Sequence, residues 1–292
     1  MLIQQIINGL TIGSTYALVA IGFTMVFGVL QLTNFANGSF YMFGAYITLT
    51  FLTIFENNFI LATLCSVVIM GLLGACMDKF ALKPIRTRKA APIAALISTV
   101  GIATCMDNLV QVIFGSATKP FPDALGLPSF NVGGVIISGL QILIFCVTII
   151  IMVILFFLVN KTKVGQAMRA TSQNASAARL MGINVDSIIT LTFFIGSALA
   201  AVAGSLIGMY YQAIDTTLAM SVSMKTFAAA VLGGIGVLPG AVVGGLLIGL
   251  VETIVASYIS SGYRDAIAFA ILIIVLVFKP SGLMGKDQIT KV

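Results

Sequence analysis

Residues 1–55 read MLIQQIINGLTIGSTYALVAIGFTMVFGVLQLTNFANGSFYMFGAYITLTFLTIF and contain no charged side chain. The first charged residue of the chain is Glu56. A helix needs about 20 consecutive apolar residues to cross the hydrocarbon core of a bilayer. This stretch is therefore long enough for two crossings, and we predict membrane-spanning helices at about 6–30 and 36–55.

The rest of the chain has the same apolar character. Of its 292 residues 59% are hydrophobic and 8% are charged, and its mean hydropathy is +1.13. Soluble proteins carry roughly 25% charged residues, so a soluble enzyme, a disordered tail and a nucleic-acid-binding module are excluded. Further apolar segments lie at about 59–80, 92–114, 139–160, 188–212, 226–258 and 264–280. The sequence predicts an all-α polytopic membrane helix bundle with about eight transmembrane helices plus a short broken helix, in a single domain over residues 1–292.

The basic residues predict the orientation of the bundle. Twelve of the 15 Lys and Arg residues fall in three groups between apolar segments. They are Lys79, Lys83, Arg86, Arg88 and Lys89; Lys161, Lys163, Arg169 and Arg179; and Lys279, Lys286 and Lys291. Loops rich in Lys and Arg stay in the cytoplasm. We therefore expect the N-terminus outside, the C-terminus in the cytoplasm and the segment 161–187 on the cytoplasmic side.

The segment 226–258 contains a break at Leu238-Pro239-Gly240. With residue 225 outside and residue 280 inside, this segment must enter the membrane and return before the last span. Residues 226–238 are too short for a full crossing at 1.5 Å per residue. We predict a short helix that ends at the break and a full helix that returns. Whether the short helix crosses or re-enters stays open, but it needs protein around it, which places it centrally in the assembly.

Small residues recur at helical spacing in two places. One ridge consists of Gly196, Ala200, Gly204 and Gly208, and the other of Gly236, Gly240 and Gly244 beside Pro239. Small residues four apart allow helix backbones to approach closely in lipid. Two interpretations are open: the ridges serve helix packing alone, or the thin helices also line and gate a pathway.

Several kinds of chemistry are excluded by absent residues. No histidine occurs, so histidine triads, metal sites and proton relays are excluded. The four cysteines (Cys65, Cys76, Cys105 and Cys146) lie in apolar segments without a Cys-x-x-Cys pair and are interpreted as small hydrophobic residues. The sequence also lacks the Gly-x4-Gly-Lys-Ser/Thr phosphate loop. We therefore predict a chain that is not an enzyme and that binds no cofactor or metal.

The cytoplasmic segment 161–187 predicts a short helix outside the membrane. Asn174 is a favourable N-cap, residues 175–181 are good helix formers, and Gly182 suits the left-handed position after a helix. Ser176-Ala177-Ala178-x3-Gly182 resembles the Glu-Ala-Ala-x3-Gly loop of ATP-binding cassette (ABC) importer permeases. In that family the helix docks into a cleft of the ATPase subunit. This chain has Ser176 where the family pattern has Glu, so a charge contact is lost or moved.

Over nearly its whole length the chain resembles the short permease of a branched-chain amino-acid ABC importer. The residues that carry the resemblance are 34–39 (NFANGS), 42–46 (MFGAY), 168–170 (MRA), 178–183 (ARLMGI), 232–241 (LGGIGVLPGA), 252–253 (ET), 261–266 (SGYRDA) and 279–283 (KPSGL). Two departures are Asn37, where similar proteins usually have His, and Asp107, where Gln is more usual. These two departures affect the chemistry expected along the substrate path, but they do not change the class of protein that the resemblance implies.

The resemblance implies a set of partners and a location. The partners are a second permease subunit, two ABC ATPase subunits that hold ATP and Mg, and an extracytoplasmic amino-acid-binding protein, in the bacterial plasma (inner) membrane. The residues expected to couple to the ATPases are Arg169, Asn174, Ser176, Ala177, Ala178, Arg179 and Gly182. The implied substrates are leucine, isoleucine and valine.

An amino acid crosses as a zwitterion, so its path needs donors and acceptors but little net charge. The candidates are polar residues at the break between the first two spans, with one acid deep in the fourth span: Asn34, Asn37, Ser39, Tyr41 and Asp107. Local turn chemistry is the other interpretation of the first four. Asp107 is either protonated and hydrogen-bonded or lines an aqueous path, because a bare charge there is costly.

Two other functions stay open at this point. Related permeases move other small polar solutes such as urea, amides, nucleosides or sugars. An ion-coupled secondary carrier would need a buried coupling site, for which Asp107 and Glu252 are the candidates. A scaffold without a pathway is a weaker third alternative, since polar residues stand at the helix breaks.

Overall fold

The computed structural model describes residues 2–88, 90–132, 134–279 and 281–285. Lys89, Lys286 and Lys291 of the predicted basic groups, and Pro280 of the 279–283 motif, lie outside the described residues. Within them the chain is almost entirely helical, with two small two-stranded sheets that pair β1 with β4 and β2 with β3. The predicted all-α membrane bundle is confirmed.

The helices are α1 (Leu2–Leu30), α2 (Asn37–Ile54), α3 (Phe59–Met77), the π-helix η1 (Asp78–Leu82), α4 (Lys83–Thr87), α5 (Pro92–Phe114), α6 (Gly139–Lys161), α7 (Lys163–Gln173), α8 (Ala175–Leu180), α9 (Val185–Tyr211), α10 (Leu218–Gly233), α11 (Leu238–Tyr258), the 3-10 helix η2 (Ser261–Tyr263) and α12 (Arg264–Phe278). The strands are β1 (Lys119–Pro120), β2 (Ser129–Val132), β3 (Val135–Ser138) and β4 (Ala213–Ile214).

Seven stretches are long and apolar enough to cross a membrane: α1, α3 with its continuation to Thr87, α5 from Ile93, α6, α9, α11, and η2 with α12. Two further helices belong to the bundle: α2, with 18 residues, and the shorter apolar helix α10, with 16. Together these make the eight long helices and one short helix that the apolar segments predict.

The break in the segment 226–258 differs from the prediction. The short helix α10 begins at Leu218 and ends at Gly233, and α11 begins at Leu238. The chain turns at Gly234 and Gly236, whose φ angles are +104° and +89°, values that glycine adopts without strain. Pro239 lies in the first turn of α11, where its missing N–H costs nothing. The prediction started α10 too late because it treated Lys225 as an outer-loop residue, whereas Lys225 is buried inside the bundle.

Helix α1 forms the centre of the bundle. It packs against α11, α9 and α10, and most of its residues are buried. The contact with α11 is close because glycines face each other. A Cβ atom built on Gly249 would lie 2.3 Å from the Cα atom of Gly13. A side chain at this position would collide with the backbone of the other helix, so glycine permits the close approach.

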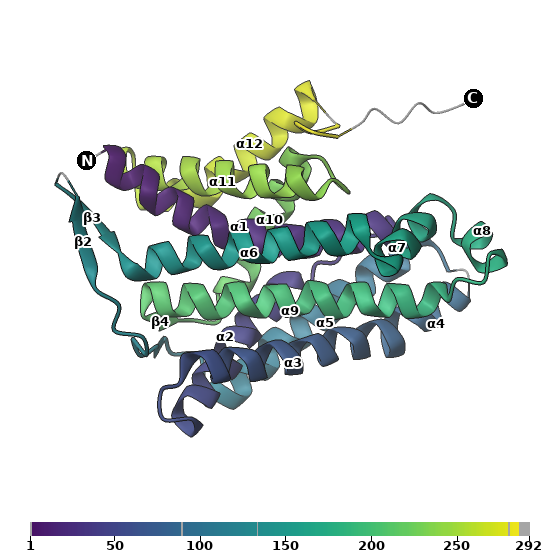
Figure 1. The fold of residues 1–292 in the computed structure, drawn as a ribbon, viewed down its shortest axis with the longest axis horizontal. Coiled ribbons are helices and arrows are strands. Elements are labelled where there is room, and N and C mark those ends of the chain that lie inside the picture. The colour runs from purple at the N-terminus through teal and green to yellow at the C-terminus, as the bar shows by residue number, and fades with distance from the viewer. Residues whose placement is uncertain (1, 89, 133, 280, 286–292) are drawn as a thin grey trace.

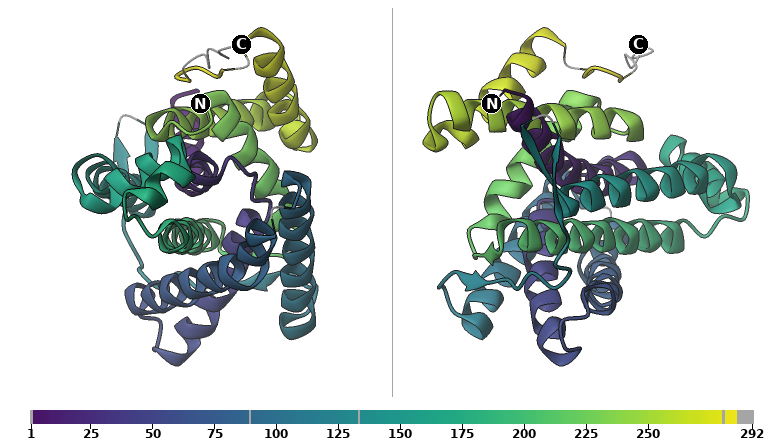
Figure 2. Two further views of the ribbon diagram at one scale, coloured as in Figure 1. Left: turned by 90° about the vertical axis from the view of Figure 1, so that its right-hand side faces the viewer. Right: turned by 60° about the vertical axis from the view of Figure 1, so that its left-hand side comes forward.

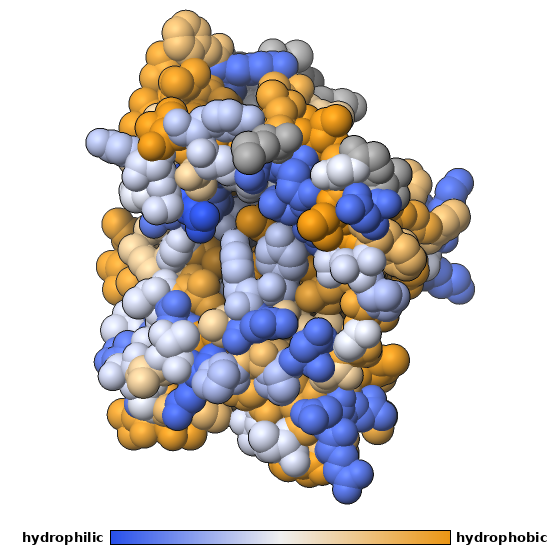
Figure 3. Space-filling model, turned by 90° about the vertical axis from the view of Figure 1, so that its left-hand side faces the viewer, coloured by the Kyte–Doolittle hydropathy of each residue, from blue (hydrophilic) through white to orange (hydrophobic). Residues whose placement is uncertain are grey.

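The two ends of the molecule differ in character. Figure 1 shows α1, α6 and α9 along the long axis, with α7, α8 and α4 at one end and the N-terminus with the β2–β3 hairpin at the other. The right-hand view of Figure 2 shows the same separation of the teal helices α7 and α8 from the N-terminal end. The described residues of the first two predicted basic groups therefore share one end, as the positive-inside argument requires. In Figure 3, which faces the opposite end, hydrophilic residues surround a hollowed centre.

Candidate functional site

Three of the predicted path residues hold the start of α2 in place. Asn34, Asn37 and Ser39 are buried, each with 4% exposure or less. The Asn37 amide donates to the Val19 carbonyl on α1 at 3.1 Å, and the Ser39 hydroxyl donates to the Ala103 carbonyl on α5 at 3.4 Å. Asn34 accepts from the backbone N–H of Ala36 at 3.1 Å, within a local turn. Their hydrogen bonds are thus made to the chain itself.

Tyr41, the fourth of these residues, lines a cavity near the end of the molecule that Figure 3 faces. The cavity has a volume of about 250 Å³ and lies between α1, α2, α9, α10, α11 and the start of α12. Its lining includes three tyrosines and four charged residues: Tyr16, Tyr41, Tyr211, Lys225, Glu252, Arg264 and Asp265. The cavity thus gathers tyrosine and charged side chains from six helices.

Lys225 lines this cavity and forms ion pairs with two carboxylates. The Nζ atom of Lys225 lies 2.9 Å from Glu252 Oε1 and 2.9 Å from Asp265 Oδ1. The side chains of Lys225 and Glu252 are 7% and 5% exposed, while that of Asp265 is 56% exposed at the rim. The three residues come from α10, α11 and α12. We call Lys225, Glu252, Arg264 and Asp265 the charge cluster.

The sequence interpretation missed the central residue of the charge cluster. The sequence interpretation places Lys225 in an outer loop and considers Glu252 as a coupling acid beside Asp107 and as part of the 252–253 motif. A usable signal exists, because Lys225 is the sole charged residue between Asp215 and Glu252. Two opposite charges, each isolated in an apolar run, are expected to pair when both helices enter the membrane.

Asp107 lies apart from the charge cluster. It sits on α5, is partly exposed and does not line the cavity around Lys225. Its Oδ1 atom is buried and has no hydrogen-bond partner within the described parts of the chain. The structure thus separates Asp107 from Glu252, the residue with which a carrier would have to share a coupling site.

The predicted coupling segment protrudes from the opposite end of the bundle (Figure 1). The Asn174 side chain caps α8 by accepting from the Ala177 N–H at 3.0 Å, and Gly182 has the expected left-handed φ of +83°. Ala178 is buried against the bundle, whereas Ser176, Ala177 and Arg179 are exposed. The next two side chains, Leu180 and Met181, are 89% and 83% exposed. Such apolar exposure outside the membrane suits a surface that another protein covers.

An ion network links the predicted coupling segment to the bundle. Asp186, in the first turn of α9, lies 3.3 Å from Arg179, 3.4 Å from Lys83 and 3.6 Å from Arg86. Arg86 also pairs with Asp78, which is fully buried and accepts from the Thr190 hydroxyl at 2.6 Å. The sequence interpretation did not identify this network. It connects α8 to α4, η1 and α9.

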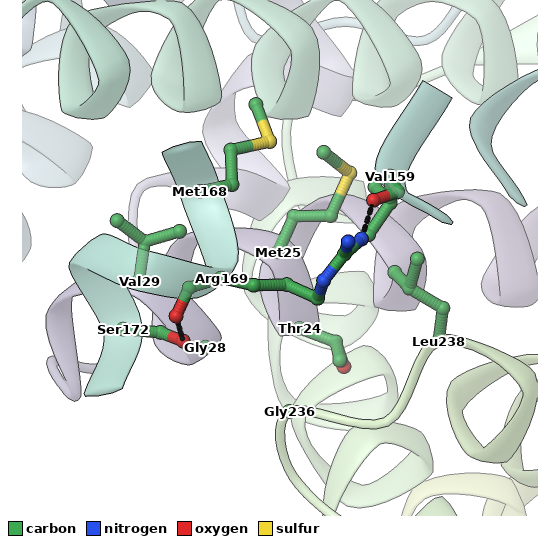
Figure 4. A pocket seen from close by; sticks show the side chains of 10 residues that line it. All are labelled: Thr24, Met25, Gly28, Val29, Val159, Met168, Arg169, Ser172, Gly236 and Leu238. Atoms are coloured by element: carbon green, nitrogen blue, oxygen red, sulfur yellow. Dashed lines mark hydrogen bonds between the residues drawn. The ribbon is translucent and has the colours of Figure 1, made fainter. Parts of the chain in front are cut away.

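Arg169, the remaining predicted coupling residue, lies on the preceding helix α7. Figure 4 shows its side chain extending toward Val159, whose carbonyl accepts a hydrogen bond from the guanidinium. Arg169 lines a cavity of about 100 Å³ together with Thr24, Gly236 and Leu238. Arg169 thus faces the junction of α1, α6, α7 and the turn before α11.

The predicted glycine ridges lie at close helix contacts. A Cβ atom on Gly204 would lie 2.0 Å from the Tyr41 carbonyl oxygen, and one on Gly244 would lie 2.0 Å from that of Ala229. Gly196, Gly208 and Gly240 also face neighbouring helices or side chains within 3.2 Å of such an atom. Gly236 departs from the predicted ridge, because it lies in the turn before α11 and not on the helix. These contacts agree with the packing interpretation.

Comparisons with known proteins find the same kind of relative over nearly the whole chain. The family described as "Branched-chain amino acid transport system / permease component" matches residues 5–276. The chain is 40% identical to the high-affinity branched-chain amino acid transport system permease protein BraD of Pseudomonas aeruginosa, covering 99% of this chain and 98% of that protein. It is 37% identical to the corresponding permease protein LivH of Escherichia coli K12, covering 99% and 97%.

A more distant relative and a solved structure extend the likeness. A probable branched-chain amino acid transport permease protein LivH from Methanocaldococcus jannaschii is 30% identical, covering 97% of this chain and 93% of that protein. The solved structure, PsaBC from Streptococcus pneumoniae in complex with Fab, has a TM-score of 0.50 at 14% identity and covers 94% of this chain and 91% of that chain. The latter likeness concerns the fold alone.

Proposed function

The chain belongs to the family of branched-chain amino acid transport system permease components, and from that premise we propose that it imports leucine, isoleucine and valine as part of an ABC importer. It is a multi-pass membrane permease subunit. The observation that carries the ATP-driven mechanism is the capped helix α8, which projects from the bundle and exposes Leu180 and Met181. A projecting helix with apolar exposure is what an ATPase cleft would cover.

The energy for transport would come from partner subunits. The chain has no phosphate loop for nucleotide, so ATP and Mg would be bound by two ABC ATPases docked on the end that carries α7 and α8. A second permease subunit would complete the path as a heterodimer, and an extracytoplasmic binding protein would deliver the substrate at the other end. The N-terminus would then lie outside and the C-terminus in the cytoplasm of a bacterium, as the basic loops predict.

When the ATPases close, their movement would be transmitted to the transmembrane helices through the ion network around Asp186. This residue lies between Arg179 of α8 and both Lys83 and Arg86 of α4. Because Asp186 is in the first turn of α9, a displacement of α8 would be passed to α9 and to the end of α3 together. We place the coupling of nucleotide binding to helix movement at this junction.

An ion-coupled carrier is the weaker alternative. Its two candidate acids lie on different helices, Asp107 on α5 and Glu252 on α11, and only Glu252 lines the cavity with the charge cluster. The full-length relatives are named as permeases of branched-chain amino acid transport systems. Other small polar solutes are less favoured for the same reason.

The proposal is tested by purifying the tagged chain from its native membranes in mild detergent and identifying the proteins that come with it. We expect a second permease and two ATPases that carry phosphate loops. Recovery of the chain alone, in a form that still transports after reconstitution, would contradict the proposal and favour the carrier.

A further inference from the structure

The cavity that contains the charge cluster is formally neutral although it is rich in charge. Lys225 and Arg264 contribute two positive charges, and Glu252 and Asp265 contribute two negative charges. The charges come from three helices, α10, α11 and α12, that meet at this point. Lys225 and Glu252 are buried inside the membrane bundle, which is costly, and such ionisable groups usually mark a pathway for a polar solute.

Two atoms of the charge cluster are left without partners. Glu252 uses Oε1 for Lys225, while its Oε2 atom is buried and forms no hydrogen bond of normal geometry among the described residues, although Tyr16 of the same cavity lies beside this carboxylate. The Nε atom of Arg264 is likewise buried and unpaired in the same part of the chain. Buried polar atoms are nearly always paired, so an unpaired acceptor and an unpaired donor lining the same cavities indicate that a bound solute completes them. Both residues also line a second cavity beside α1, of about 190 Å³.

The unpaired atoms are of opposite kind. Glu252 Oε2 is an anionic acceptor, which suits an ammonium group, and the Arg264 guanidinium is a cationic donor, which suits a carboxylate. We propose that the charge cluster is a transit site in which Glu252 holds the α-ammonium group of the amino acid and Arg264, with Lys225, holds its α-carboxylate. This inference rests on the proposed function and names the residues by which the permease recognises its substrate class.

A small solute fits this site better than a docking protein does. The carboxylate of Glu252 and the ammonium of Lys225 lie beneath the surface, with side-chain exposures of 5% and 7%. Pockets that hold drug-sized ligands have volumes of roughly 300–1,000 Å³, and the cavity of about 250 Å³ is of the size class of a smaller solute. Within the charge cluster, Asp265 at the rim is the residue exposed enough for contact with a binding protein. Tyr211, Ser261 and Gly262 of the cavity lining are exposed as well.

The site would select solutes that carry both charges. A zwitterion leaves the site neutral, whereas a singly charged amine or carboxylate would leave one charge of the site unbalanced in a poorly hydrated cavity. Sugars, nucleosides and urea carry neither charged group. The charge cluster would therefore favour amino acids as a class, and the side chain would be chosen elsewhere.

The test uses the complete transporter with its binding protein, reconstituted in vesicles, and a variant that removes the buried pair without leaving a lone charge. Lys225→Met with Glu252→Met replaces two long polar side chains by apolar ones of similar volume, a change that buried ion pairs often tolerate. The matched control is Glu56→Gln with Lys119→Met, which also removes one acid and one base but lies outside the cavity. ATP-dependent leucine uptake and the affinity of the complex for its binding protein are measured for each.

We expect the Lys225/Glu252 double variant to assemble, to bind its binding protein normally and to lose at least about 10-fold in uptake, the equivalent of one charged contact. Lys225→Arg keeps the charge and should retain most of the rate, and the control should stay within about twofold, as surface changes do. Uptake near the wild-type rate in the double variant overturns the inference. Loss of binding-protein affinity with normal assembly also overturns it, because the cluster would then be a docking surface.

If the double variant fails to assemble, the variant Asp265→Asn tests the transit site instead. Asp265 is 56% exposed, so its amide is accommodated in the fold, and it shares Lys225 with Glu252. Reduced uptake with an intact complex and unchanged affinity for the binding protein supports the transit site. Unchanged uptake, or reduced uptake that follows a loss of binding-protein affinity, overturns it. Absence of ATP-dependent leucine uptake in the wild-type complex would instead contradict the proposed function and would be seen before any variant is compared.

Discussion

Lys225 and Glu252 are 27 positions apart in sequence, yet their charged atoms lie 2.9 Å from each other. Each alone would be expensive in a membrane bundle, and the pairing makes both tolerable. The sequence shows that these charges are isolated, but it does not show which helices meet. A site residue can therefore be predicted from the sequence when neighbouring residues determine its role, as for the Asn174 cap. It cannot be predicted when its role depends on a contact between helices that are distant in sequence.

The first prediction concerns the stability of the buried pair. Lys225→Met leaves the Glu252 carboxylate buried without its cation, which should lower the free energy of unfolding by about 3–5 kcal/mol. Adding Glu252→Met should restore most of that loss. Unfolding in mixed detergent micelles measures both variants, with Glu56→Gln as an exposed control. Equal stability of the single variant and the wild type would contradict the burial of the pair.

Asp107 and Asp78 allow a matched comparison of two acids. Asp107 has an unpaired Oδ1 and is partly exposed on α5, whereas Asp78 is fully buried and bound by Arg86 and Thr190. Asp107→Leu should fold and transport within about twofold of wild type, as changes outside a network do. Asp78→Leu should lose about 3–5 kcal/mol of stability, because it leaves Arg86 without a buried partner. Membrane yield and uptake separate the two, and abolished uptake in Asp107→Leu at normal yield would give Asp107 a role in the path.

At the scale of elements, the sequence predicts most of the long helices, but it predicts the residues at which they begin and end correctly only in some cases. The α5 boundaries at 92 and 114 agree with the prediction, since Pro92 and Gly115 mark the ends of an apolar run. Helix α7 was not predicted, because its buried face consists only of Gly165, Met168 and Thr171. Their spacing of three is a helical signal, but a weak one in a polar segment. The turn between α10 and α11 required the positive φ of Gly234, which sequence alone does not give.

The close contact between α1 and α11 predicts that a leucine is destabilising at Gly249 on α11 and tolerated at Gly101 on α5. Gly249→Leu would force a side chain into the backbone of Gly13, only 2.3 Å from the new Cβ, and should cost about 1–3 kcal/mol or more. Gly101→Leu on α5 meets nothing within 4 Å and should be tolerated. Thermal stability of the purified complex measures the difference. Equal stability of the two variants would contradict the close packing of α1 on α11.

The coupling role of α8 can be probed without straining its backbone. Gly182→Trp should block ATPase docking, but the φ of +83° makes any side chain at Gly182 strained. Ala177→Trp places the same bulk on an exposed helical position and is the cleaner variant. We expect it to lose ATPase co-purification by about 10-fold or more, because a closely packed interface excludes the ring. Ser129→Trp, exposed on β2 at the other end, is the control. If the ATPases stay bound to Ala177→Trp and uptake survives, α8 is not the coupling helix.

At the scale of the whole molecule, the two proposed functional regions are separated along one axis. The ion network and α8 lie at one end, and the charge cluster lies toward the other, beside Tyr211 at the end of α9 and Arg264 at the start of α12. Helix α1, in contact with α11, α9 and α10, runs between them. Composition and basic loops predicted this polarity, because burial and charge placement in a membrane follow simple rules. The cavity was not predictable, since it depends on how six helices cross.

The most direct test of the whole account is leucine uptake by the reconstituted complex into vesicles under two energy sources. The account predicts uptake when ATP is supplied to the side that carries the ATPases, and continued uptake when ionophores abolish proton and sodium gradients. Uptake that ignores ATP and stops with the ionophores would contradict an ATP-driven permease and show that the chain works as an ion-coupled carrier.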